Sequence, residues 1–179
     1  FRPALKDKPV VVLSNTDGCV GALSKEAKKL GIKMCDPWYQ IESSYTKKGG
    51  SAFSSNYELY ADISARIMTT LERLSPNIEI YSIDEAFLDL TGVNNCQNLQ
   101  DFGMQCKETI KQWTGMPVRV GIAPTKTLSK IASYGAKYYP ATQGVVDLSK
   151  PERQKKLLNL VPVQEVWGVG RKIHKRLNQ

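Results

Sequence analysis

The chain has 179 residues, 41% of them hydrophobic, and this size and composition allow one large domain or two small ones with a genuine apolar core. No apolar run approaches the roughly 20 residues of a membrane span and no charged-then-apolar leader is present, so we expect a cytoplasmic protein with no membrane partner. The net charge of +8 is uneven, because residues 1–116 hold 13 Lys/Arg against 14 Asp/Glu, whereas residues 117–179 hold 12 against 3.

The cysteine and histidine pattern is not that of a zinc site. Cys19, Cys35, Cys96 and Cys106 form no C-x-x-C pair, and His174 is the only histidine. The ligand spacings typical of structural zinc are therefore absent. For a cytoplasmic chain we expect reduced, packed thiols.

The first part of the chain predicts a strand, a turn and a short helix. Residues 9–13 (PVVVL) are typical of a buried strand, and residues 15–18 (NTDG) of a turn. Ser24 is placed to cap the helix and Gly31 to end it. Beyond the helix, two stretches are typical of turn and loop, residues 36–38 and 47–51.

A long amphipathic helix is the next predicted element. Ser55-x-x-Glu58 has the form of a capping box, and Ser75-Pro76 stops the pattern. Between them, apolar residues recur at helical spacing: Tyr60, Ile63, Ile67, Leu71 and Leu74.

Two short apolar runs, residues 78–82 and 86–90, then meet at adjacent carboxylates. β-Branched and aromatic residues crowd both runs, so we predict a hairpin whose tight turn carries Asp84 and Glu85. A solvated turn is one interpretation, because aspartate is a common turn residue. The other is a divalent-metal site, since hard cations such as Mg²⁺ take carboxylate oxygens and share them with substrate phosphates.

The remaining elements alternate between helix and strand. A helix over about residues 98–114 is predicted to turn five side chains inward, namely Leu99, Phe102, Cys106, Ile110 and Trp113. Strands are predicted at 118–122 and 144–148, on either side of a helix over about 125–137. Ser149-x-x-Glu152 predicts the start of a further helix.

The order helix, hairpin, helix, strand across residues 56–122 is that of a ferredoxin-like βαββαβ unit without its first strand. The sequence therefore predicts an α+β fold, with a small α/β unit before this sheet and a basic helical segment after it. Units of this kind form the palm of many nucleotidyl transferases.

Four segments carry a specific resemblance. They are residues 17–20 (DGCV), 53–60 (FSSNYELY), 81–87 (YSIDEAF) and 166–171 (VWGVGR). In this order they resemble the UmuC-type branch of the Y-family translesion DNA polymerases, and the match covers nearly the whole chain. The resemblance implies a DNA-directed DNA polymerase with fingers at 1–54, a palm at 55–148 and the start of a thumb at 149–179.

The resemblance also implies roles for particular residues. Asp84 and Glu85 match the palm carboxylates that hold two Mg²⁺ ions, together with another aspartate. Lys28 and Lys137 match the lysines that contact the triphosphate of the incoming nucleotide. Two small residues match those that roof the nascent base pair, Cys19 and Gly21. Lys25 departs from the family, many members of which have tyrosine there.

The C-terminal glycines resemble the hairpin of a helix-hairpin-helix. Gly168 and Gly170 would let backbone N–H groups approach a DNA phosphate, and Arg171 and Lys172 add positive charge. The basic C-terminal third favours the same kind of partner, a polyanion such as nucleic acid, although a solvated basic face is the alternative. An ordinary turn between helices is the alternative for the glycines alone.

The resemblance leaves two family elements outside the chain. The third metal-binding aspartate lies in a segment resembling D-x-N-x-F-Y-A-S-C-E ahead of Phe1, and the little finger lies beyond Gln179. We therefore expect a fragment of a polymerase that is inactive alone. By resemblance, its partners would be damaged primer–template DNA, deoxynucleoside triphosphates, an SOS accessory subunit, RecA and the sliding clamp.

Two other functions stay open. A diguanylate-type nucleotide cyclase also has acidic residues on a palm hairpin, but Gly-Gly precedes its Asp-Glu, where this chain has Ser82 and Ile83. A non-catalytic DNA-binding fragment is the second, because the basic third is complete whereas the metal site is not.

Overall fold

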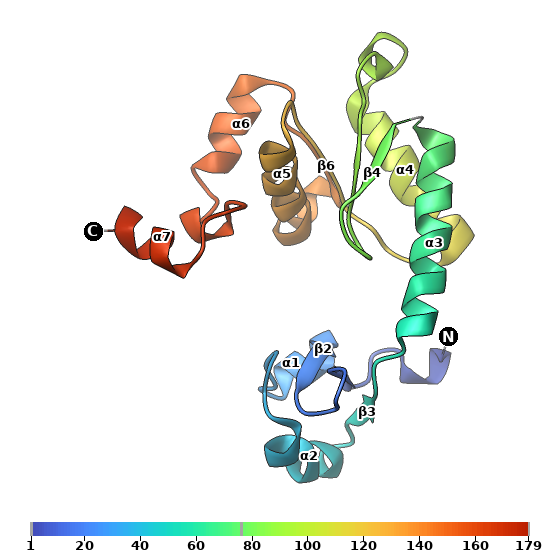
Figure 1. Cartoon of the computed structure of the whole chain (residues 1–179), viewed down its shortest axis with the longest axis vertical. Helices are drawn as coiled ribbons and strands as arrows, with labels where there is room; N and C mark the ends of the chain where they lie inside the picture. The colour runs from blue at the N-terminus through green and yellow to red at the C-terminus, as the bar shows by residue number, and fades with distance from the viewer. Residues whose placement is uncertain (1, 76, 179) are drawn as a thin grey trace. The chain divides into compact units, whose positions relative to one another are not determined.

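The computed structural model describes residues 2–75 and 77–178 (Figure 1). The contacts between residues divide the chain into two compact units, residues 1–59 and 60–179, which are described separately. Pro76, predicted to stop the long helix, lies outside the described residues, and the helix ends at Leu74. Within the described ranges, no helix has the length and apolar character that a membrane crossing requires.

The first unit is a three-stranded sheet covered by helices, with strand order β2-β1-β3. The central strand is antiparallel to β2 and parallel to β3, and its side chains Val11 and Leu13 pack with Val20, Ala27 and Tyr45 in a small core. The strands are β1 (Val10–Leu13), β2 (Val20–Leu23) and β3 (Ser51–Phe53), and the helices are η1 (Pro3–Leu5), α1 (Lys25–Lys29) and α2 (Trp38–Lys47).

The predicted strand, turn and capped helix are confirmed, and four elements were missed. Ser24 caps α1 by accepting a hydrogen bond from the Ala27 N–H, and its hydroxyl also donates to the Lys8 carbonyl, which ties the helix to the strand. η1, β2, α2 and β3 were not predicted. η1 and the two strands have only three or four residues each, and α2 begins at Trp38, after Pro37, with no side-chain cap.

The long helix α3 (Tyr57–Leu74) is confirmed, but its predicted capping box is wrong. The Leu59 N–H donates to the side chain of Asn56 (3.0 Å), whereas the Ser55 hydroxyl donates to the Leu13 carbonyl instead. Asn is as good an N-cap as Ser, and here the serine already has a partner.

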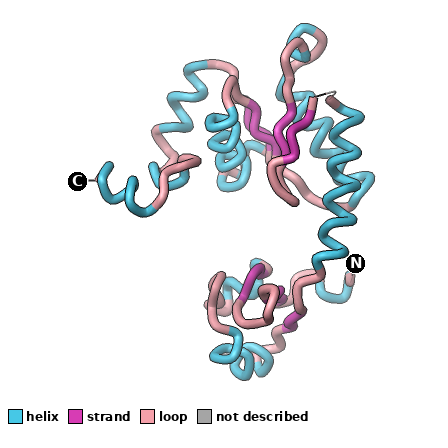
Figure 2. Tube along the Cα trace, in the orientation of Figure 1, coloured by secondary structure: helices cyan, strands magenta, loops and turns pink. Residues whose placement is uncertain are grey.

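The strands of the second unit form two separate pairs (Figure 2). β4 (Ile78–Ile80) and β5 (Ala86–Leu88) make the predicted antiparallel hairpin, and β6 (Val120–Ile122) runs parallel to β7 (Val145–Asp147). The helix α4 (Leu99–Thr114) connects β5 to β6, yet these two strands are not hydrogen-bonded neighbours in the described part of the chain. This is the α+β arrangement expected of a ferredoxin-like palm without its first strand, and the predicted fold class is confirmed.

The helix α4 has the predicted ends and, with one exception, the predicted inner face. Asn98 caps it, Gly115 ends it with φ of 75°, and Phe102, Cys106 and Ile110 are buried. The exception is Trp113, which is 55% exposed, with the Arg73 guanidinium 5.8 Å from its ring centroid.

The four cysteines are free, but only part of the thiol prediction holds. Cys106 is buried and Cys19 is half-buried, whereas Cys35 and Cys96 are exposed. The prediction of packed thiols is therefore wrong for the last two.

The basic part of the chain is mostly helical. Its helices are α5 (Lys126–Tyr138), η3 (Pro140–Thr142), α6 (Pro151–Leu158), η4 (Val163–Glu165) and α7 (Arg171–Leu177), and η2 (Val93–Asn95) precedes α4. α5 packs closely on β6, because a Cβ at Gly121 would lie 2.3 Å from the Ser129 carbonyl oxygen. The predicted helix α6 is confirmed, but Ser149 does not cap it. Its hydroxyl donates to Asp147.

Candidate active site

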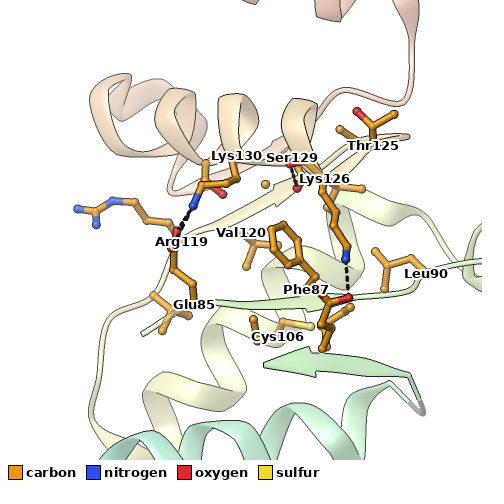
Figure 3. A pocket seen from close by; sticks show the side chains of 18 of the residues that line it. Glu85, Phe87, Leu90, Cys106, Arg119, Val120, Thr125, Lys126, Ser129 and Lys130 are labelled. Atoms are coloured by element: carbon orange, nitrogen blue, oxygen red, sulfur yellow. Dashed lines mark hydrogen bonds and ion pairs between the residues drawn. The ribbon is translucent and has the colours of Figure 1, made fainter. Parts of the chain in front are cut away.

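A cleft of about 1750 Å³ lies in the second unit, where β5 and β6 are not paired. Its lining includes buried side chains of α4, among them Phe102, Cys106 and Ile110. Burial raises the pKa of the Cys106 thiol to about 11, so this group stays protonated and acts as an apolar part of the lining. In Figure 3, Phe87 and Val120 lie between α5 and the Cys106 side chain. This part of the lining has the buried, apolar character of a protein core.

The two candidate metal-binding carboxylates lie in the loop of the hairpin and line this cleft. The loop spans residues 81–85, longer than the predicted tight turn, and is closed by Tyr81 and Ser82 N–H groups that both donate to the Glu85 carbonyl (3.0 Å each). The Ser64 hydroxyl of α3 donates to the Ile83 carbonyl (2.6 Å) and so holds the loop against the helix. Hydrogen bonds thus hold the loop both where it joins the strands and at Ile83.

Asp84 and Glu85 have different partners. The Asp84 carboxylate accepts a hydrogen bond from the Ser82 hydroxyl (2.7 Å). The Glu85 carboxylate accepts from Lys130, whose Nζ lies 2.9 Å from Oε1 and 3.0 Å from Oε2 (Figure 3). One turn earlier on α5, Lys126 forms an ion pair with Glu79 of β4. Two lysines of α5 therefore link this helix to the hairpin.

Three aromatic rings surround these lysines. Tyr81, Phe87 and Trp167 lie in mutual contact, with ring centroids 5.5 to 6.1 Å apart. The Lys130 Nζ lies 4.8 Å from the Tyr81 ring centroid and 5.3 Å from that of Trp167, and the Lys126 Nζ lies 5.2 Å from that of Phe87. Such distances allow cation–π attraction. The cluster joins the hairpin, α5 and the segment before α7.

The carboxylate oxygens of Asp84 and Glu85 are the hard ligands that Mg²⁺ prefers. Asp89, at the far end of the hairpin, accepts hydrogen bonds from the hydroxyl (2.6 Å) and the N–H of Thr91. These bonds, the one from the hydroxyl most of all, hold the pKa of Asp89 below its ordinary value. No group of three or more potential ligands occurs in the described parts of the chain. The two carboxylates therefore offer the oxygen chemistry that a divalent ion takes, but in the described residues they belong to no group of three potential ligands.

The structure brings some of the other predicted residues to the same cleft. Lys137, on the last turn of α5, lines it, as does Gly168. Gly168 has φ of 94°, which favours glycine, and Gly170 immediately precedes α7, whose first residues Arg171 and Lys172 are exposed.

The remaining predicted residues lie in the first unit. Lys28 is exposed on α1, Gly21 is exposed on β2, and Cys19 is half-buried and bridges to Pro37. A Cβ at Gly21 would have only ordinary contacts of 3.5 Å or more, so the fold itself does not require glycine there.

Lys126, Lys130 and Trp167 line the cleft and were not predicted. In the sequence, Lys126 and Lys130 are only two lysines four residues apart on a predicted helix, a pattern that does not identify their partners. Their glutamate partners lie 47 and 45 residues away, and a local pattern contains no information on such pairs.

Solved structures with the same fold are DNA polymerases. The chain superposes on DinB from Sulfolobus solfataricus with a TM-score of 0.79 and 31% identity, covering 98% of this chain and 51% of that one. An insertion ternary complex of Dbh DNA polymerase gives a TM-score of 0.80 at 31% identity, with the same coverage. The fold is that of the Y-family polymerases.

The sequence identifies the branch of that class. Residues 1–134 match the IMS (impB/mucB/samB) family, and the chain belongs to it. It is 57% identical to the protein UmuC of Salmonella typhimurium over 179 residues, or 99% of this chain and 42% of that protein. It is also 34% identical to DNA polymerase IV of Sulfurisphaera tokodaii, and this match covers 99% of the present chain and 50% of that protein. The chain thus spans about half or less of these relatives.

Proposed function

We propose that this chain is the part of a UmuC-type translesion DNA polymerase that carries the fingers (1–54), the palm (55–148) and the start of the thumb (149–179). The observation that carries the proposal is the loop bearing Asp84 and Glu85 at a cleft, in a chain 57% identical to the protein UmuC. The polymerase names of the relatives and structural neighbours support it.

The proposed reaction is addition of a deoxynucleotide to a primer, in DNA repair and SOS mutagenesis. Asp84 and Glu85 would hold Mg²⁺, two ions being expected in the complete site with the aspartate of the preceding family segment. When bound, the ions would stabilise negative charge on the attacking and leaving oxygens. Lys28 and Lys137 would neutralise the triphosphate, and Cys19 and Gly21 would leave room above the new base pair.

The proposed partners follow from the same chemistry. Exposed Arg171 and Lys172, beside the backbone N–H groups at Gly168 and Gly170, favour contact with DNA phosphates rather than with bases. Damaged primer–template DNA and deoxynucleoside triphosphates are the proposed substrates. The SOS accessory subunit, RecA and the sliding clamp rest on family resemblance alone.

Primer extension compared with duplex retention tests this proposal. A chain extended by the family's N-terminal aspartate segment should add nucleotides in the presence of Mg²⁺, whereas residues 1–179 alone should retain duplex without extending it. If the extended chain retains duplex DNA but never elongates the primer, the non-catalytic alternative is correct. The family assignment favours the polymerase over the nucleotide cyclase, and incubation with GTP alone should yield no cyclic dinucleotide.

We expect Lys28→Ala and Lys137→Ala each to lower kcat/KM for the incoming nucleotide by roughly ten- to a hundred-fold, the value of one charge-assisted phosphate contact. Duplex affinity should change little, because these lysines would face the nucleotide. The measurement is a nucleotide titration of the extended chain, with Lys33→Ala as a surface-lysine control. An unchanged titration for both variants would make these lysines ordinary surface residues.

DNA binding should be nearly blind to sequence and should weaken steeply with salt, because contacts to phosphates release counterions. Arg171→Ala should reduce the slope of log Kd against log salt by about one, the value for one phosphate contact. Arg66→Ala is the matched control, since Arg66 is paired with Asp62 on α3. A salt-insensitive footprint with a preferred sequence would contradict this role.

A further inference from the structure

The Glu85 carboxylate is already neutralised by a cation that belongs to the chain. The ammonium of Lys130 lies within 3.0 Å of both carboxylate oxygens. Its side chain is 25% exposed, compared with 48% for Glu85, so the pair is partly shielded from water. Asp84 has no such arrangement, because its described partner is the neutral hydroxyl of Ser82.

Lys130 is held in this position by contacts that do not involve Glu85. The Tyr81 and Trp167 rings both lie within cation–π distance of its Nζ. Its helix is fixed by the close approach of α5 to Gly121, which leaves no room for a Cβ. If Glu85 found another partner, the ammonium would still have two aromatic faces beside it.

We propose that Lys130 is a positioning residue that occupies the cation position at Glu85, so that a divalent ion binds there by exchanging with the ammonium. This inference rests on the proposed function of the carboxylate loop. In the exchange no covalent bond changes. The ammonium would leave the carboxylate, keep its charge and stay against Tyr81 and Trp167, and the oxygens of Glu85 would then be available to hold a divalent ion.

Two consequences follow from this exchange. While the site holds no metal, Lys130 keeps Glu85 turned toward the cleft and prevents repulsion between the adjacent carboxylates of Asp84 and Glu85. When metal is present, Lys130 competes with it and lowers its affinity. Lys126 serves as an internal comparison, because it lies one turn away on the same helix and pairs with Glu79, outside the carboxylate loop.

Manganese binding, followed by the electron paramagnetic resonance of free Mn²⁺, tests the proposal on the chain of residues 1–179 in the cold. Lys130→Met removes the charge but keeps a side chain that packs on the rings. It should tighten Mn²⁺ binding by roughly three- to ten-fold, the value of a half-shielded ion pair with aromatic support. Lys126→Met should change it by less than about two-fold, because Lys126 forms an exposed ion pair with Glu79 and not with a carboxylate of the loop.

Two further variants keep the test decisive. Lys130→Arg retains a cation and should bind Mn²⁺ as the parent does. Adding Glu85→Gln to Lys130→Met should remove the gain, which shows that the competition occurs at this carboxylate. Equal Mn²⁺ affinity for Lys130→Met and the parent, weaker binding by Lys130→Met, or an equal gain from Lys126→Met would each overturn the proposal.

The Mn²⁺ measurement and the primer-extension test can fail independently of each other. The Mn²⁺ measurement uses no DNA and no nucleotide, so the exchange can be confirmed even if the chain proves to be non-catalytic. Conversely, primer extension that depends on Asp84, together with Mn²⁺ binding that is indifferent to Lys130, would confirm the polymerase and reject the exchange.

Discussion

Replacing Asp84 with alanine in a chain extended by the family's N-terminal aspartate segment should abolish nucleotide addition and leave duplex binding nearly intact. If Asp84 holds a metal ion as proposed, its removal should withdraw several kcal/mol of transition-state stabilisation, and about 4 kcal/mol corresponds to a thousand-fold loss of rate. The DNA phosphate contacts proposed for Gly168 and Gly170 would not involve this side chain. The measurement is single-turnover primer extension with Mg²⁺, beside a duplex-retention assay.

Asp62→Ala is the matched control for Asp84→Ala. Asp62 is another exposed aspartate of the second unit, paired with Arg66 on α3. Its removal should leave the rate of extension within about two-fold, because exposed ion pairs contribute little. If the Asp84→Ala variant extends the primer at near the parental rate, Asp84 has no role in catalysis.

The second large effect concerns stability. β5 and β6 are joined by a helical crossover but are not paired with each other, and the cleft of about 1750 Å³ lies along them. Two strand edges with unpaired N–H and C=O groups, and the apolar lining at Phe102 and Ile110, therefore lack partners in the described residues. A domain with these features should be marginal and prone to aggregation.

Extending the chain by about 15–20 residues that include one further strand should fill the cleft. If the added pairing and burial amount to about 4 kcal/mol, the melting midpoint should rise by about 10 °C and the transition should become cooperative. Thermal unfolding of the two chains, followed by circular dichroism, measures this. A matched extension with proline at every second strand position is the control, because proline cannot donate to a ladder. A bare chain that melts as sharply and as high as the extended one would contradict the account of the cleft.

Short-range sequence patterns were sufficient to predict much of the secondary structure of the second unit. Both ends of α4 and the start of α5 follow from the caps Asn98 and Thr125 and from Gly115, because short-range hydrogen bonds and a left-handed backbone determine these positions. The hairpin follows from its β-branched and aromatic runs. The missing pairing between β5 and β6 was also predictable, since it depends on the order of the elements alone.

Other features depend on contacts that a linear pattern does not contain. The capping box failed because the Ser55 hydroxyl has a partner 42 residues away, in Leu13. Trp113 continues the apolar period of α4 but lies exposed beside Arg73. The link between Lys130 and Glu85 joins two elements through the cleft, and neither residue shows it in its own neighbourhood.

Iron-directed cleavage can show whether the loop carrying Asp84 and Glu85 binds a divalent ion, as the proposed nucleotide transfer requires. Fe²⁺ bound in place of Mg²⁺, with ascorbate and peroxide, produces hydroxyl radicals that cut the backbone near the ion. In the extended chain, cuts should concentrate around residues 83–86, disappear in Asp84→Ala and be suppressed by excess Mg²⁺. Cleavage spread evenly along the chain, or unchanged in Asp84→Ala, would mean that this loop does not hold the ion.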